Sequence, residues 1–80
     1  MRELIEYQAA RIETVLALHR MPGRVTGGHV TPRWTRFQVV PDAGIELSSV
    51  QRLAGELAVA LDVPLVRVLR LGVAVDIEVL

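Results

Sequence analysis

Few side chains in this 80-residue sequence have the chemistry for acid–base or metal-assisted catalysis. His19 and His29 are the two groups whose ordinary pKa lies near neutral pH. They follow no H-x-x-H or H-E-x-x-H spacing, and the sequence has no cysteine to complete a zinc site. We interpret both as structural or surface histidines, and we expect no metal and no cofactor.

Serine and paired carboxylates have simpler explanations than catalysis. Ser48 and Ser49 lie outside a G-x-S-x-G setting, so we interpret Ser48 as a helix N-cap, with Gln51 three residues later in a capping-box pattern. Asp76 and Glu78 share one strand face, and paired carboxylates can act as acid and base. Because the opposite strand face is aliphatic, we interpret the pair as the solvated side of an edge or half-exposed strand.

Nucleotide chemistry is also not expected. A P-loop needs the pattern G-x-x-x-x-G-K-[ST], and a dinucleotide fold needs G-x-G-x-x-G at a strand-to-helix junction. Gly23, Gly27 and Gly28 fit neither pattern, and all nine basic residues are arginine. We therefore predict that this chain is not an enzyme and does not hydrolyse ATP itself.

The strongest binding candidates surround the single tryptophan. Trp34 and Arg36 share a strand face with Gln38, and Arg33 is adjacent. Such residues can stack on bases and contact phosphates, and they also dominate protein–protein hot spots. The formal net charge of +0 favours a protein partner over nucleic acid. A third interpretation, in which Trp34 packs at the sheet rim beneath another element, remains open.

Two arginines of a later strand complete the candidate set for contact with DNA or a partner. Arg67 and Arg70 are three residues apart, so strand alternation places them on opposite faces. They cannot form one patch unless Arg36 or Arg52 contributes to it.

The hydrophobic pattern predicts the elements that position these side chains. Helical spacing predicts a helix from Arg2 to about Arg20 and a second from Ser48 to Leu61. Two-residue alternation predicts four strands, at 24–31, 34–40, 65–71 and 73–79. The glycine pair in the first strand predicts a bulge, a bend or a close backbone approach. The order α-β-β-α-β-β indicates an α+β fold with two helices packed on one face of a mainly antiparallel sheet.

The length allows one small domain, residues 1–80, with an aliphatic core. Such a chain buries only about 60% of its unfolded surface, so we expect self-association to add stability. No apolar run approaches the roughly 18 residues of a membrane span, and the N-terminus lacks the apolar core of a signal peptide. We therefore expect no membrane insertion and a cytoplasmic location.

The stretch from Thr31 to Leu61 also resembles a known family. Thr35-Arg36-Phe37 precedes Pro41-Asp42-Ala43-Gly44-Ile45, and a helix rich in leucine and alanine follows. This order is similar to the (V)TR(Y/F)xxxPxxG(V) pattern in the alpha module of the FtsK/SpoIIIE DNA translocases. The similarity extends outward to QAARIETVLALHRMPGRV before this stretch and to VRVLRLGVAVDIEV after it.

The resemblance implies a part of a multi-domain motor that acts in bacterial chromosome segregation and cell division. In that family the alpha modules form a ring beside an ATPase ring, duplex DNA passes through the centre, and the ATP-binding residues lie in a separate RecA-like domain. This chain would then be a non-catalytic module for ring assembly and DNA guidance, with Arg36 matching the TR arginine. Ile45-Glu46 and the short Leu71-Gly72 turn depart from the family pattern, and both departures remove positive charge.

A second hypothesis belongs to a different class. It treats the chain as a small self-associating protein–protein interaction module without nucleic-acid binding. The first hypothesis has an ATPase motor domain and duplex DNA as partners in addition to self-association. The second has only self-association or another protein.

Overall fold

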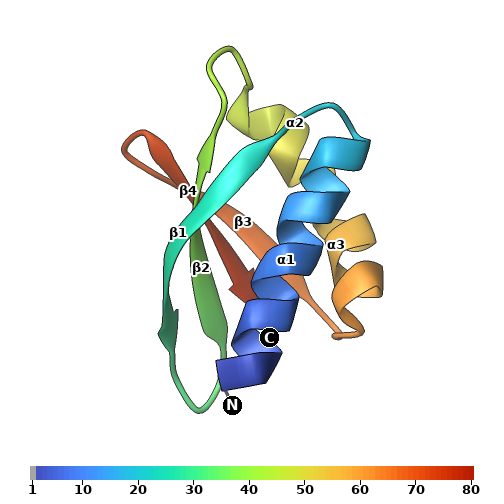
Figure 1. Ribbon diagram of the computed structural model, residues 1–80, viewed down its shortest axis with the longest axis vertical. Coiled ribbons are helices and arrows are strands. Elements are labelled where there is room, and N and C mark those ends of the chain that lie inside the picture. Colours follow the sequence, from blue (N-terminus) through green and yellow to red (C-terminus); the bar gives the residue numbers. More distant parts are fainter. Residues whose placement is uncertain (1) are drawn as a thin grey trace.

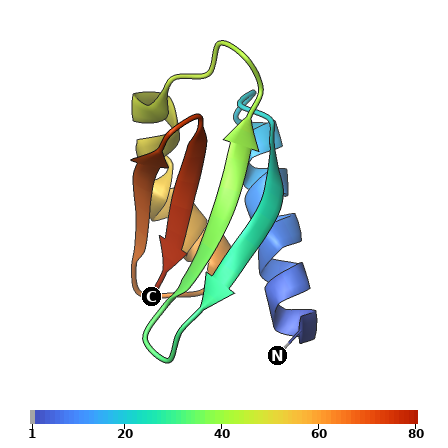
Figure 2. The ribbon, with the colours of Figure 1, turned by 90° about the vertical axis from the view of Figure 1, so that its left-hand side faces the viewer.

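The computed structural model describes residues 2–80 and confirms the α+β fold with the order expected (Figure 1). The elements are α1 (Arg2–Leu18), β1 (Gly23–Val30), β2 (Thr35–Pro41), α2 (Leu47–Gln51), α3 (Ala54–Leu61), β3 (Val66–Leu71) and β4 (Ala74–Val79). The strands form one antiparallel sheet in the order β1-β2-β4-β3. The helices lie on one face of this sheet, and Figure 2 looks onto the other face, which none of the helices in residues 2–80 covers. None of the helices described is long and apolar enough to cross a membrane.

Aliphatic side chains fill the space between the sheet and the helices. α1 lies against β1, α3 lies against β3, and the two helices contact each other. Alternation along each strand sends every second side chain into this space. The largest fully buried side chains come from both layers: Phe37, Ile12, Leu16, Leu57, Ile77, Val39 and Val50. The one phenylalanine therefore lies in an otherwise aliphatic core, as the composition predicts.

The glycine pair in β1 marks both an irregular register and a close backbone approach. The pairing of β1 with β2 shifts between Val25 and Gly27, which is a β-bulge. A Cβ atom added to Gly28 would lie 3.0 Å from the carbonyl oxygen of Arg36. The expectation of a bulge or a close approach is thus confirmed.

The second helical segment is two short helices, not the single helix expected from Ser48 to Leu61. Between α2 and α3 the N–H of Leu53 donates to the carbonyl of Val50, a tighter turn than an α-helix makes. The residue before α2 is Glu46, and it makes no side-chain cap, so the predicted Ser48 capping box is wrong. Gln51 does not reach back to the helix start because its side chain bonds to β3. The apolar residues of this segment nevertheless lie in the core: Val50, Leu53, Leu57 and Leu61.

Helix side chains form hydrogen bonds with backbone groups of the two outer strands, β1 and β3. Glu13 of α1 accepts the N–H of Val25 in β1 at 2.8 Å, and Gln51 of α2 donates to the carbonyl of Val68 in β3 at 3.2 Å. Unpaired backbone groups on an edge strand invite pairing with another chain. Together with the bulge in β1, these two bonds restrict strand addition at either edge.

We predict that Leu57→Ala lowers the free energy of unfolding by about 2–5 kcal/mol, because it opens a cavity beneath α3. Leu57 is 0% exposed, whereas Val59 on the same helix is 83% exposed. Val59→Ala is the matched control and should change the stability by less than about 0.5 kcal/mol. Urea unfolding followed by circular dichroism measures both. Similar losses in the two variants would place Leu57 outside the core.

Candidate functional site

The uncovered face of the sheet carries one row of charged side chains. In the strand register, His29 of β1 lies opposite Arg36 of β2. Arg36 lies opposite Glu78 of β4, and Glu78 lies opposite Arg67 of β3. Directly opposite residues on neighbouring strands are close enough for their side chains to interact. We refer to His29, Arg36, Glu78 and Arg67 as the charged row.

Glu78 is the centre of the charged row. Arg36 donates from Nη2 and Nε to Glu78 Oε2, at 2.6 and 3.2 Å. Arg67 Nη2 lies 2.8 Å from the other oxygen, Oε1. Glu78 is only 3% exposed although no helix covers it, because the neighbouring side chains close over it. Each carboxylate oxygen thus meets a different guanidinium, one from each flanking strand.

A second carboxylate lies beside the charged row. Asp76 Oδ2 is 3.5 Å from Arg36 Nε, and Asp76 is 5% exposed. It lies opposite Gln38 of β2 in the register. A hollow of about 390 Å³ opens above this carboxylate, and it is lined by Gly28, His29, Arg36, Gln38 and Asp76. The charges of Arg36 and Arg67 are therefore balanced by those of Asp76 and Glu78.

The interpretation of Asp76 and Glu78 as the solvated side of an edge or half-exposed strand is wrong. β4 is a central strand with β2 on one side and β3 on the other. Side chains from both neighbours therefore cover its outer face, and the two carboxylates are buried among them. Alternation correctly places both carboxylates on one face but does not show which strands flank them.

The pairing in the charged row lowers the pKa of Glu78. The hydrogen bond from the Arg36 side chain is the largest cause, burial acts in the opposite direction, and the charges of Arg67 and Arg36 lower the pKa further. Glu78 therefore stays ionised throughout the neutral range.

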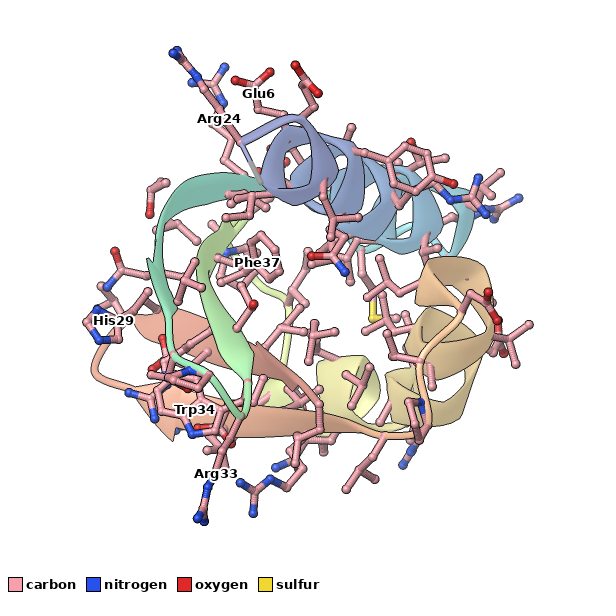
Figure 3. All side chains as sticks on the ribbon, turned by 90° about the horizontal axis from the view of Figure 1, so that it is seen from below. Glu6, Arg24, His29, Arg33, Trp34 and Phe37 are labelled. Atoms are coloured by element: carbon pink, nitrogen blue, oxygen red, sulfur yellow. The ribbon has the colours of Figure 1, made fainter. Side chains whose placement is uncertain are left out.

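The loop between β1 and β2 presents the tryptophan at one end of the charged row. The guanidinium carbon of Arg36 lies 4.4 Å from the centroid of the Trp34 ring, which is cation–π geometry. The His29 and Trp34 rings are 6.1 Å apart. The Thr31 hydroxyl accepts the N–H groups of Arg33 and Trp34, which fixes the loop. Figure 3 shows Phe37 pointing into the core, whereas His29, Trp34 and Arg33 lie outside it.

The structure brings some of the predicted contact residues together and separates others. Arg36 and Arg67 meet at Glu78, and Trp34 adjoins Arg36, while Arg33 is exposed at the loop. Arg70 lies elsewhere: it borders a hollow lined by residues 44–48 on the helix side of the sheet. Arg67 and Arg70 thus lie on opposite faces, as alternation predicts. Sequence reasoning missed Glu78 as the residue that joins the two arginines, because this requires the strand order.

The histidines differ in their surroundings. Nε2 of His19, at the end of α1, lies 2.6 Å from Oε2 of Glu56 in α3. His29 borders the hollow beside Asp76. Among residues 2–80, no group of three or more potential metal ligands is found. Glu78 fixes the positions of Arg36 and Arg67, so the charged row is suited to recognition through these two arginines.

Comparisons with known proteins match nearly the full chain. The family model described as FtsK alpha domain covers residues 1–79. A protein from Sporosarcina ureae named DNA translocase FtsK is 32% identical over 59 residues. That alignment covers 74% of this chain and 8% of the relative, so the chain is similar to a small part of a much longer protein.

We predict that Glu78→Gln lowers the free energy of unfolding at pH 7 by about 1–3 kcal/mol, because Arg67 loses its charged partner and Arg36 keeps only Asp76, at 3.5 Å. The pKa of Glu78 in the folded state is below its ordinary value of 4.5. The ion pairs therefore stabilise the fold above that pH, and their contribution is lost as the pH falls through the lower folded-state pKa. Urea unfolding across this acid range should show a shallower pH dependence for the variant than for the wild type.

Glu6→Gln is the control for this prediction. Glu6 pairs with Arg2 on the exposed side of α1, where an ion pair contributes little. The free energy of unfolding of the Glu6→Gln variant at pH 7 should stay within about 0.5 kcal/mol of the wild-type value. If the free energy of unfolding depended on pH in the same way in the wild type and in Glu78→Gln, the stabilising role assigned to the ion pairs of Glu78 would be contradicted.

Proposed function

This chain belongs to the FtsK alpha-domain family, and from that premise we propose that it serves as a non-catalytic module of a DNA translocase. Its role in this proposal is to join neighbouring copies beside an ATPase motor and to guide duplex DNA. The match of the alpha-domain model to residues 1–79 is the observation that carries the proposal. ATP hydrolysis is assigned to a separate motor domain, since the matched family model is that of the alpha domain.

The loop end of the uncovered face is the surface that suits DNA. Arg33 is exposed there, and Arg36 stacks on Trp34 next to it. Arg36 uses Nε and Nη2 to bond Glu78, and its other N–H donors remain for a phosphate. Arginine and aromatic side chains that are held in place contact a DNA backbone with little loss of conformational entropy.

The balance of charge on the uncovered face of the sheet supports guidance of duplex DNA and not tight binding to it. Arg36 and Arg67 are offset by Asp76 and Glu78 on the same face. Binding to duplex DNA depends on the number of phosphates that a protein neutralises, so this surface offers a weak, sequence-independent contact. A weak contact is what a module needs if DNA is to move past it.

The alternative is a self-associating module without nucleic-acid binding. The same balance of charge favours it, because phosphates must compete with Glu78 and Asp76 for the arginines. Trp34 and Arg36 would then form the centre of a protein–protein contact. The two functions differ in whether DNA changes the sedimentation of the protein.

We predict that a short fluorescent duplex sediments with the protein at low salt and is released as salt rises. Arg33→Gln should weaken binding and lower the slope of log affinity against log salt by about one, because one phosphate contact is lost. Arg70→Gln makes the same change on the opposite face of the sheet and should leave binding unchanged. Sedimentation velocity at two salt concentrations measures both effects.

Trp34→Ala tests the aromatic part of this surface. It should weaken DNA binding or assembly while the circular dichroism spectrum stays that of the folded protein. Unfolding of this variant would mean that Trp34 is needed for the fold. Oligomers that form equally with and without DNA, and leave the duplex free at low salt, would favour the alternative function.

A further inference from the structure

The buried carboxylate of Asp76 has an ion-pair contact but no hydrogen-bond donor. Nε of Arg36 lies 3.5 Å from its Oδ2, and that Nε donates its hydrogen to Glu78. Within residues 2–80, no hydrogen bond from a backbone or side-chain donor ends on the Asp76 carboxylate. Buried polar groups in folded proteins are usually hydrogen-bonded, and a carboxylate accepts several such bonds. The acceptor capacity of Asp76 is therefore available to a ligand.

The charged row shows what Asp76 lacks. Glu78 lies two residues later on the same strand face, with Arg36 on its β2 side and Arg67 on its β3 side. Each guanidinium contacts a different oxygen of Glu78. A buried carboxylate on this face is thus held between two guanidinium groups, of which Asp76 shares only the one from Arg36.

The neighbours of Asp76 across the strands leave its carboxylate open. It lies opposite Gln38 of β2 and Leu69 of β3. Neither side chain is charged, and the Gln38 amide accepts a hydrogen bond from the hydroxyl of Thr26 through Oε1. The position that corresponds to Arg67 in the charged row is therefore held by a leucine.

The hollow above Asp76 has room for a side chain from outside. Its volume is about 390 Å³, and His29 and Gln38 are part of its lining. A guanidinium group suits this lining, because its planar fork can donate two parallel N–H groups to one carboxylate and can stack on an aromatic ring such as that of His29. An ammonium group is a compact point charge and gains less from either contact.

We infer that this hollow binds the guanidinium group of an arginine side chain from a partner protein, with Asp76 accepting two of its N–H groups. The bound arginine does for Asp76 what Arg67 does for Glu78. This inference goes beyond the proposed function, because the ligand is a cation whereas DNA is a polyanion. It also uses different residues, since Arg33 and Trp34 take no part in it.

A nuclear magnetic resonance titration of the isotope-labelled 80-residue chain at pH 7 tests the inference. The probe is a blocked tripeptide with arginine between two glycines, and the matched lysine tripeptide is the comparison. We expect saturable shifts at the residues that line the hollow, and several-fold weaker binding of the lysine peptide. Asp76→Asn should raise the dissociation constant of the arginine peptide by about tenfold or more, because the charged acceptor is lost. Asp42→Asn makes the same change at an exposed carboxylate after β2 and should leave the constant unchanged.

Leu69→Arg tests the site even if Asp76→Asn unfolds. The new side chain lies opposite Asp76 on β3, as Arg67 lies opposite Glu78, so it should supply the second guanidinium from within the chain. We expect this variant to weaken binding of the arginine peptide by about tenfold. Val73→Arg adds the same charge at an exposed side chain between β3 and β4, and it should weaken binding by less than about twofold.

Four outcomes would overturn the inference. The first is equal affinity for the arginine and lysine peptides, and the second is no saturable shift at the hollow with either peptide. The third is an equal response to Leu69→Arg and Val73→Arg, or to Asp76→Asn and Asp42→Asn. The fourth is a set of shifts at the hollow that appears when the chain alone is concentrated, which would identify the occupant as a second copy. All four are measured without DNA, so they are independent of the proposed DNA contact.

Discussion

The bond between Arg36 and Glu78 holds together two halves of the chain that are far apart in sequence. β1 with β2, and β3 with β4, are hairpins that form from neighbouring segments, but the sheet is complete only when β2 pairs with β4. Arg36 and Glu78 lie opposite each other at that junction, and Arg67 extends the contact to β3. The uncovered face of an antiparallel sheet can remain solvated. Here Arg36 and Arg67 pair with Asp76 and Glu78 across the strands, so the two carboxylates are buried without a second layer of structure.

The two faces of the domain are consequently suited to different contacts. The sheet face presents oriented guanidinium groups and a tryptophan, with charges that largely cancel, which fits a weak and reversible contact with a polyanion or a polar protein surface. The helix layer presents Leu18 and Val59, which line a groove between α1 and α3 and are 76% and 83% exposed. The sheet separates this apolar surface from the charged row.

Periodicity in the sequence predicts which residues share a face, and these predictions hold for the strands. It places Arg67 and Arg70 on opposite sides and puts Asp76 and Glu78 together, and the glycines of β1 indicate the bulge. The failures concern relations between elements. The burial of Glu78 depends on β4 lying between β2 and β3, which the spacing within one strand does not reveal. The break between α2 and α3 escapes prediction because the apolar spacing continues through it. Beside the break, Gln51 bonds to the carbonyl of Val68, a partner 17 residues away in the chain. The assignment of the surface to DNA or protein rests on family membership and not on geometry alone.

The side chains of Glu13 and Gln51 on the two outer strands have a mechanical consequence. An assembly built by extending a sheet from one subunit to the next is held by many backbone hydrogen bonds, and separating its subunits means unzipping a strand. Here both outer strands already have bonds from their own helices. Adding a strand from another chain at either edge would therefore have to compete with Glu13 or Gln51 for a backbone group. A contact made through side chains would instead leave every strand of the domain in its own register.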